Sequence, residues 1–344
     1  MSPLCANKLY YRIEGELIMR AAWHTKFGPA EEVLEIGILD IPVPATGEVL
    51  IRVYASGINP LDVKKRAGLR GSLKVERAIP HYDGAGIIEA VGEGVDSQRI
   101  GQRVWLFEGQ YNCWLGTAAE YTCISESRAI LLPDSVSFSE GACLGIPALT
   151  AHRAVCADGS VNGKTVLVTG AAGAVGGYAV QFAALLGATV IGTVSTDKKA
   201  MIAKSNGAKH VINYKTENVI ERVKELTNGE GVDRVVEVEL GGNMPVTSRV
   251  LNKNAVIAAY ASMSVPEAPL PFYPLLSTGP SIQIVACFTV PEADKIQGAK
   301  DISSWMAADQ LQHNIGATYA LEEIIIAHQS VENGLLTGGA VLLI

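Results

Sequence analysis

The hydrophobic pattern of the chain changes at about Gly163. Before that residue, short apolar runs alternate with polar positions and end in turn residues, as in GEVLIRVYASGINP, YDGAGIIEAVGEGV and GQRVWLF. Alternation of this kind predicts a strand-rich domain. After that residue, continuous apolar runs such as TVLVT and ATVIGTVS alternate with helical stretches. That texture predicts a parallel sheet covered by helices on both faces.

Two helical pieces are expected between these regions, within PDSVSFSEGACLGIPALTAHRAV. Ser137 and Glu140 have the spacing of a capping box, which marks the start of a helix. Pro147 follows, and a proline inside a helix removes a backbone donor and interrupts the helix. We therefore expect the helix to break at Pro147.

The run TVLVT leads directly into GAAGAVGG, which opens a helix. Small residues at such a turn let the backbone approach a pyrophosphate at the helix N-terminus. Compared with the GxGxxG pattern, the chain has Ala171, Gly173 and Gly176, so alanine replaces the first glycine. The strand before and the helix after favour a dinucleotide site over a turn that only permits close packing.

The next strand, ATVIGTVS, ends without the Asp or Glu that commonly holds the ribose hydroxyls of NAD. Asp197 lies slightly beyond and is expected to cap the following helix. Ser195 and Lys199 offer a hydroxyl and a cation for a 2′-phosphate, and Tyr214 ends the third strand, VINY. The pattern favours NADPH; the alternative is that the lysines only begin a solvated helix.

Composition restricts the classes of function. A net charge of −7 disfavours a general nucleic-acid surface, and no apolar run reaches the roughly eighteen residues of a membrane span. The six cysteines are scattered with no CxxC, which is typical of reduced thiols in the cytosol. Residues 1–18 lack the apolar core of a secretory signal and are expected to form an extension outside the fold.

From Met19 onward the chain resembles the zinc-independent quinone oxidoreductases of the medium-chain dehydrogenase/reductase superfamily, the group that includes zeta-crystallin. The stretches that carry the resemblance are, in order, SGINPLDVKKRAG, YDGAGIIEAVGEGV, GTAAEY, GACLGIPALTAHRAV, VLVTGAAGAVGGYAVQFA, GTVSTDKKA, VINY and AHQSVENG. It implies an α/β fold with a GroES-like, β-rich catalytic domain over 19–143, completed by 293–344. A Rossmann domain with a doubly wound parallel sheet would span 144–292, with the cofactor in the cleft between the domains.

The resemblance also implies site residues. Asn59 would approach the nicotinamide. Separately from the resemblance, Lys64, Tyr82, Tyr260 and Phe288 are candidates to line the quinone site, and Lys64 or Tyr82 would donate a proton to a quinone oxygen or steady it; the catalytic candidates are thus Asn59, Lys64 and Tyr82. The cofactor-binding set is Asn59, Thr150, Ala172, Gly173, Ala174, Val175, Gly176, Ser195, Lys199, Tyr214, Ala259, Tyr260, Cys287 and Phe288. The chain departs from the family at Lys64, where TYIRSG is common, and in LLTGGAVLLI, which lacks a basic residue.

No metal is expected. Asn59 occupies the first cysteine position of the zinc-dependent relatives, and HYDGAG replaces their GHE, so His81 stands without thiolate partners.

The leading hypothesis is a cytoplasmic NADPH-dependent quinone reductase, working by one-electron or hydride transfer on a small-molecule quinone. An alkenal or enone reductase on the same scaffold is the enzyme alternative. A structural or RNA-binding role, as in crystallin relatives, is disfavoured by the acidic charge. The apolar strand SIQIVACFTV predicts a homodimer or homotetramer.

Overall fold

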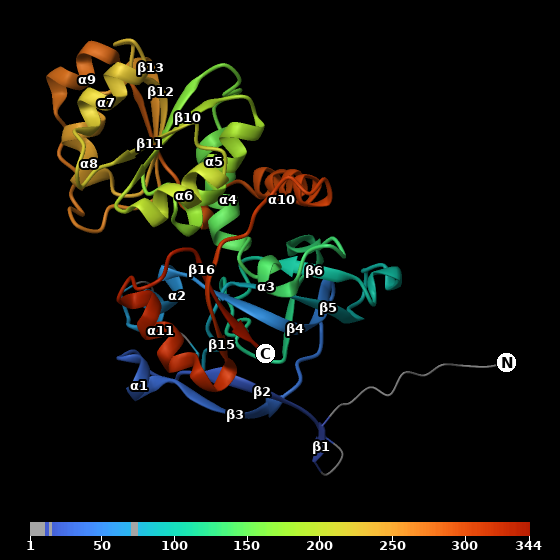
Figure 1. Cartoon of the computed structure of the whole chain (residues 1–344). Coiled ribbons are helices and arrows are strands. Elements are labelled where there is room, and N and C mark those ends of the chain that lie inside the picture. The colour runs from blue at the N-terminus through green and yellow to red at the C-terminus, as the bar shows by residue number, and fades with distance from the viewer. Residues whose placement is uncertain (1–10, 14–15, 70–74) are drawn as a thin grey trace. The chain divides into compact units, whose positions relative to one another are not determined.

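The computed structural model describes residues 11–13, 16–69 and 75–344 (Figure 1). The chain divides into two compact units. The first combines residues up to 142 with 318–335 and 340–344, and the second combines 143–317 with 336–339. Of residues 1–18, which were expected to lie outside the fold, 11–13 and 16–18 belong to two paired strands of the first unit.

The first unit is built on antiparallel sheets. A three-stranded sheet has the order β1-β2-β3, and a larger sheet has the order β15-β16-β4-β5-β6-β8, with β7 also paired to β4. The strands are β1 (Tyr11–Ile13), β2 (Glu16–Trp23), β3 (Glu35–Asp40), β4 (Glu48–Ile58), β5 (Asp83–Val91), β6 (Arg103–Leu106), β7 (Tyr121–Ser125), β8 (Ala129–Leu131), β15 (Ile315–Ala320) and β16 (Gly339–Leu343). The helices are α1 (Ala30–Val33), α2 (Pro60–Arg66), α3 (Phe138–Gly141) and α11 (Ile324–Glu332).

The alternating pattern of β4 explains its place in the larger sheet. Val49, Ile51 and Val53 point to one face and pack with Ile88 and Val104 in a buried cluster. Because side chains alternate across a strand, this face forms the core while the intervening positions are less buried. The strand-rich prediction for this part of the chain is confirmed.

The second unit holds a six-stranded parallel sheet with helices on both faces (Figure 1). The strand order is β11-β10-β9-β12-β13-β14, so the order reverses between β9 and β12. The strands are β9 (Thr165–Val168), β10 (Thr189–Val194), β11 (His210–Asn213), β12 (Val232–Glu237), β13 (Leu251–Ala259) and β14 (Ser281–Ile284). The helices are α4 (Gly145–Cys156), α5 (Ala174–Leu185), α6 (Asp197–Ser205), α7 (Val219–Leu226), α8 (Leu240–Thr247), α9 (Phe272–Thr278) and α10 (Glu292–Ala307). This is the doubly wound Rossmann topology.

The predicted helix break is present, but its predicted cause is wrong. Ser137 Oγ accepts from the Glu140 N–H, and Glu140 Oε2 accepts from the Ser137 N–H, so the capping box of α3 is confirmed. Helix α4 begins at Gly145, before Pro147. A proline in the first turn is tolerated because its missing N–H would have no helical partner there.

The strand predicted over SIQIVACFTV is shorter than expected. β14 ends at Ile284, and the Val285 N–H makes the last bond to β13, with the carbonyl of Ala259 at 2.8 Å. β13 itself ends at Ala259, so the chain has no further strand to pair with and turns into a 3₁₀ helix over Cys287–Thr289.

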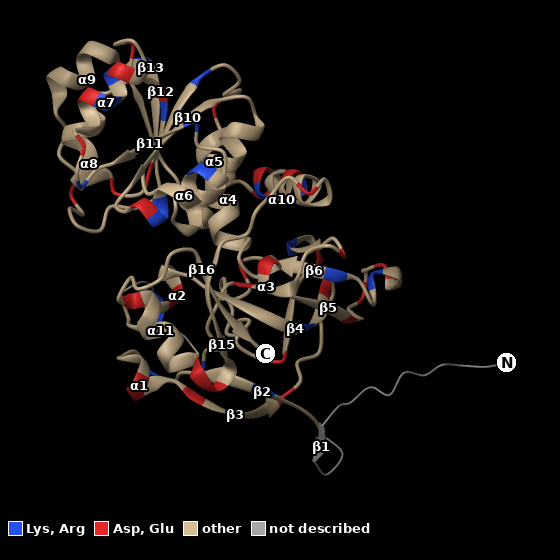
Figure 2. Ribbon diagram, viewed as in Figure 1, with Lys and Arg blue, Asp and Glu red and all other residues tan. Residues whose placement is uncertain are grey.

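Residues of both charge signs are spread along the chain. Figure 2 shows Lys and Arg (blue) and Asp and Glu (red) along the helices, strands and loops of both units. Within the described ranges, no helix combines the length and the apolar character needed to cross a membrane.

Candidate functional site

The turn after β9 has the geometry of a phosphate cradle. Gly170 has a φ of 66°, a left-handed conformation that glycine adopts without strain. A Cβ on Gly176 would lie 2.2 Å from the carbonyl oxygen of Gly170, so α5 can start this close to the strand only with glycine. Gly173 is the N-cap of α5, and no side chain caps the helix there. The first-turn N–H groups are therefore available to an anion, and the positive end of the helix dipole faces it.

The end of β10 lies beside this turn, since β9 and β10 are neighbours in the sheet. β10 ends at Val194, and the half-buried Ser195 follows. The Tyr214 N–H donates to the Val194 carbonyl at 3.0 Å, which brings the end of β11 to the same edge. The Lys199 N–H donates to Thr196 Oγ1 at 3.3 Å. Ser195, Lys199 and Tyr214 are thus gathered at one sheet edge.

The prediction that Asp197 caps α6 is wrong. Thr196 is the N-cap, and Asp197 is the first helical residue. In the first turn the Asp197 carboxylate is still favoured by the helix dipole, which accounts for an acid at this position. Asp197 and Lys198 are exposed, whereas Lys199 is half-buried.

A buried carboxylate lies where the strand order reverses. Glu237, the last residue of β12, is fully buried. Its Oε1 accepts from Thr169 Oγ1 at 2.8 Å, from Asn243 Nδ2 at 2.7 Å and from the Glu239 N–H at 2.8 Å. Its Oε2 accepts from Thr247 Oγ1 at 3.1 Å. These four donors compensate the loss of hydration and tie the ends of β9 and β12 to helix α8.

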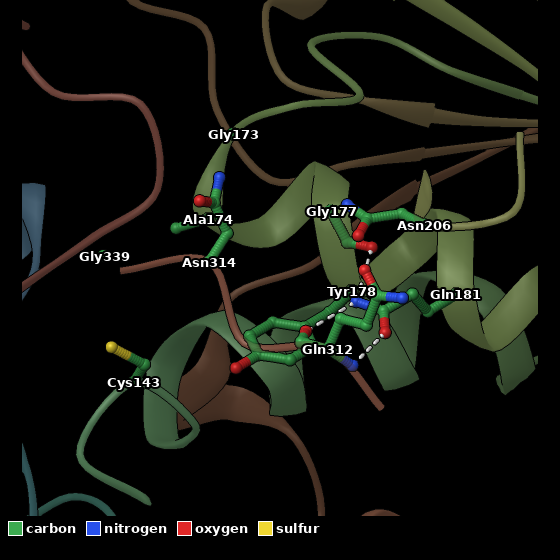
Figure 3. A pocket seen from close by; sticks show the side chains of 10 residues that line it. All are labelled: Cys143, Gly173, Ala174, Gly177, Tyr178, Gln181, Asn206, Gln312, Asn314 and Gly339. Atoms are coloured by element: carbon green, nitrogen blue, oxygen red, sulfur yellow. Dashed lines mark hydrogen bonds between the residues drawn. The ribbon is translucent and has the colours of Figure 1, made fainter. Parts of the chain in front are cut away.

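The outer face of α5 is held by the segment 312–314 (Figure 3). Gln181 Nε2 donates to the Gln312 carbonyl at 3.0 Å, and the Gln312 N–H donates to Gln181 Oε1 at 2.7 Å. A cavity of about 10 Å³ lies along this face, next to Asn206 and Asn314. It has room for about one water molecule and is too small for a dinucleotide.

In the first unit, Asn59 organises a buried polar cluster at the start of α2. Its backbone N–H donates to Asp62 Oδ2 at 2.6 Å, and its Nδ2 donates to Asp83 Oδ2 at 2.7 Å. Burial raises the pKa of Asp62 to about 7, although the backbone N–H of Asn59 and the charge of Lys65 act in the opposite direction.

The Tyr82 hydroxyl accepts a hydrogen bond from Lys65, one residue beyond the predicted Lys64. Lys65 Nζ donates to Tyr82 Oη at 2.9 Å. Lys64 is half-buried on the same helix.

Two buried histidines lie beside this cluster. His81 Nδ1 is 2.8 Å from Ser56 Oγ, and His81 Nε2 is 2.9 Å from His328 Nε2. Burial lowers the pKa of His81 to about 3. The pKa of His328 lies well below its usual value, because of burial first and then of the nearby His81, Arg66 and His24.

The predicted site residues divide between the units. Asn59, Lys64 and Tyr82 lie in the first unit, and the remaining predicted residues lie in the second. Thr150 is buried in α4, and Ala259 ends β13. The Tyr260 N–H donates to the Glu237 carbonyl at 3.0 Å, and burial together with the Glu237 charge raises the pKa of Tyr260. Cys287 and Phe288 lie in the 3₁₀ helix after β14.

Two family models match the chain: the alcohol dehydrogenase GroES-like domain over residues 45–134 and the zinc-binding dehydrogenase over residues 174–303. A quinone oxidoreductase of Sus scrofa is 31% identical over 333 residues, which cover 96% of this chain and 99% of that protein. The chain belongs to the quinone oxidoreductases of the medium-chain dehydrogenase/reductase superfamily. This confirms the resemblance and the fold class, and it makes the chain an oxidoreductase.

A solved structure and a further relative are also similar to this chain. The Escherichia coli quinone oxidoreductase, solved in complex with NADPH, superposes with a TM-score of 0.83 at 26% identity, covering 94% of this chain and 100% of that chain. A 2-haloacrylate reductase of Burkholderia is 30% identical over 338 residues, which cover 95% of this chain and 99% of that protein.

Three features of the chain were missed by sequence reasoning: the Glu237 network, the Lys65–Tyr82 contact and the His81–His328 pair. Glu237 directly follows Val235 and Val236 at the end of β12, and a carboxylate after two apolar strand residues is a signal of a buried acid. Lys65 and Tyr82 are 17 positions apart in the sequence, and His81 and His328 are 247 apart, so no local pattern indicates either contact.

Proposed function

We propose that this chain is an NADPH-dependent quinone reductase that works without zinc. The observation that carries the proposal is the end of β10, where Val194 is followed by Ser195 and by the half-buried Lys199. A carboxylate at this place would repel a 2′-phosphate, whereas a hydroxyl and an ammonium attract it.

The residues of the second unit fit the cofactor. The cradle formed by Gly170, Gly173 and Gly176 suits the pyrophosphate, because a Cβ at Gly176 would fill the approach to the Gly170 carbonyl. Ser195, Lys199 and Tyr214 would hold the adenosine 2′-phosphate. The remaining contacts would come from Asn59, Thr150 and the set that comprises Ala172, Ala174, Val175, Ala259, Tyr260, Cys287 and Phe288. When bound, the reduced nicotinamide supplies the electrons for the reaction.

The described side chains of the first unit do not fit a catalytic zinc ion. Both ring nitrogens of His81 are engaged, by Ser56 and by His328, and the Asn59 amide donates to Asp83. A zinc site needs three side chains whose lone pairs converge on one point. A quinone does not need a Lewis acid, because it is electron-poor and accepts electrons once it is held against the nicotinamide.

A second candidate function is the NADPH-dependent reduction of an α,β-unsaturated carbonyl. It is favoured by the 2-haloacrylate reductase of Burkholderia, whose 30% identity is close to that of the quinone oxidoreductase relatives. Both reactions use the same cofactor site, so only the acceptor distinguishes them.

Turnover with a panel of acceptors tests the proposal. NADPH oxidation should be followed with benzoquinones and naphthoquinones, and separately with alkenals and 2-haloacrylate. The proposal predicts a higher kcat/KM for quinones. Turnover confined to the unsaturated carbonyls would favour the second function, and RNA retention without any NADPH oxidation would contradict both.

We also infer that the chain forms a homodimer, or a homotetramer built from such dimers, through the edge of the parallel sheet. β14 is the last strand in the sheet order, and Ile284 is 69% exposed there. The adjoining helix α9 exposes Tyr273 (79%) and Leu276 (63%). Pairing of β14 with its copy about a two-fold axis would cover an edge strand and an apolar patch together.

A further inference from the structure

Lys65 and Tyr82 form a charged hydrogen-bonded pair in the first unit. Lys65 Nζ donates to Tyr82 Oη at 2.9 Å and to the Gln110 carbonyl at 3.3 Å. The Tyr82 ring is buried, and its centre lies 4.9 Å from the same Nζ. The ammonium group is therefore held against the phenol by two acceptors and by the ring.

Asp62 supports both members of the pair. It lies three residues before Lys65 on α2, a spacing that places the two side chains on one face of the helix. Its carboxyl group accepts from the backbone N–H groups of Asn59 and Tyr82, so it links the start of the helix to the segment that carries the phenol. The pair is thus fixed from two elements at once.

The direction of the Lys65–Tyr82 hydrogen bond excludes Lys65 as the acceptor of the phenol proton. An ammonium group has three donors and no acceptor, so Tyr82 Oη must accept from Lys65. The Tyr82 hydroxyl therefore keeps a proton of its own, which it can donate to another acceptor. A phenol held in this way is arranged as a proton donor whose conjugate base lies next to a cation.

We propose that Tyr82 donates its hydroxyl proton to an oxygen of the substrate and that Lys65 is the positioning residue that holds Tyr82 for this transfer; the inference rests on the proposed function. In the two-electron reaction, hydride transfer to a quinone leaves one substrate oxygen with a negative charge. The Tyr82 O–H bond breaks, and a new O–H bond forms on that oxygen. The tyrosinate remains beside the Lys65 ammonium, which returns a proton to it and takes one from water.

The charges around Lys65 determine the pH range in which Lys65 is an ammonium group that donates to Tyr82. The titratable groups near it are Asp62 on the same helix, Cys113 in the segment after β6, Tyr82 itself, and His24, whose pKa the charge of Lys65 helps to lower. Burial lowers the pKa of Lys65 below its ordinary value of 10.5, and the charges of Asp62 and Cys113 oppose this shift. The ammonium form, and with it the arrangement of the pair, is lost as the pH rises through this lowered pKa.

Steady-state kinetics of four variants test the proposal in the full-length protein with NADPH and a benzoquinone. Tyr82→Phe should lower kcat about 100-fold, and Lys65→Met about tenfold or more, because general acids contribute about 10²–10⁴ to a rate. The wild-type kcat should fall at high pH. Lys65→Arg should keep much of the rate that Lys65→Met loses, and its kcat should fall only at a still higher pH. Lys26→Met, which replaces an exposed lysine of the same unit, is the matched control and should leave kcat unchanged.

A spectroscopic titration tests the pair without cofactor or substrate. The difference in tyrosinate absorbance between wild type and Tyr82→Phe isolates Tyr82 from the other tyrosines. In a Lys65→Met background Tyr82 should ionise at higher pH, since a nearby cation favours the phenolate. This result does not depend on turnover, so it stands even if the wild type fails to reduce quinones.

Two outcomes would overturn the inference. One is a Lys65→Met variant that loses thermal stability but keeps the wild-type kcat and pH profile in the remaining folded protein, which would make the pair structural. The other is an unchanged Tyr82 titration in the Lys65→Met background. By contrast, a wild type that oxidises no NADPH with any quinone would contradict the proposed function.

Discussion

The Nε2 atoms of His81 and His328 lie 2.9 Å apart inside the first unit. One of these nitrogens must donate and the other accept, so at least one ring is deprotonated at the contact. Both residues are fully buried, and His328 comes from α11, close to the C-terminus of the chain. The contact therefore docks a late segment onto the first unit only while the pair is not doubly protonated.

This relationship predicts loss of stability in mild acid. The pKa of His81 is lowered to about 3, whereas an unfolded histidine titrates near 6.5, so the unfolded chain binds more protons between these values. The contribution to the free energy of unfolding is fully present above pH 6.5 and is lost as the pH falls toward 3, by up to about 1.4 kcal/mol per pH unit for each histidine.

Urea unfolding at pH 7, 6 and 5 measures this effect. His328→Gln should be less stable than wild type at pH 7 and should show a shallower pH dependence. His210→Gln, in the second unit, is the control and should keep the wild-type slope. Equal slopes for His328→Gln and wild type would show that the pair does not set the acid sensitivity.

The glycine cradle predicts a sharp difference between neighbouring substitutions. Gly176→Ala places a Cβ 2.2 Å from the Gly170 carbonyl, so the turn must move and NADPH affinity should fall more than about tenfold. Gly177→Ala places a Cβ 3.2 Å from Asn206 Nδ2, the end of a flexible side chain, and should change the affinity by less than about threefold. Quenching of NADPH fluorescence gives both dissociation constants. Similar affinities for the two variants would refute the cradle.

The Glu237 network predicts a stability cost that an exposed glutamate does not share. Glu237→Gln presents an amide N–H₂ group to the donors of Thr169, Asn243 and Thr247, and should lower the free energy of unfolding by about 1–3 kcal/mol. Glu230→Gln, at an exposed position, is the control and should stay within about 0.5 kcal/mol of wild type. Denaturant unfolding compares them, and equal stabilities would argue against the network.

The exposed sheet edge predicts an assembly that a single charge disrupts. Ile284→Lys places an ammonium on β14, where pairing with a second copy would bury it, so the variant should be smaller than wild type in light scattering. Leu131→Lys, a substitution at another exposed apolar position, should leave the mass unchanged. A monomeric wild type would end the proposal of a dimer.

Local sequence signals predicted most of the fold, because its elements follow their hydrophobic periods. The parallel sheet, the α3 capping box and the turn at Gly170–Gly176 are all encoded within short stretches. The predictions were wrong where neighbouring residues or strands determine the end of an element. β14 stops at Ile284 because β13 offers no further partner, and Thr196 takes the cap that Asp197 was expected to provide.

The polar cluster of the first unit could not be predicted, because its members meet only through tertiary packing. Asn59 and Tyr82 were identified, yet the cation that reaches Tyr82 belongs to Lys65, and only the rotation of α2 distinguishes it from Lys64. Likewise, nothing near His81 in the sequence indicates that His328 packs against it.

The most direct test of the account is cofactor preference at the end of β10. With a benzoquinone as acceptor, the account predicts that the wild type has a kcat/KM for NADPH at least about tenfold above that for NADH, since a charge-assisted phosphate contact contributes about 1.5–3 kcal/mol. Lys199→Ala should remove most of this preference while changing the NADH value less than about twofold, and Lys198→Ala, at an exposed position, should retain it. Equal use of NADPH and NADH by the wild type would contradict the account.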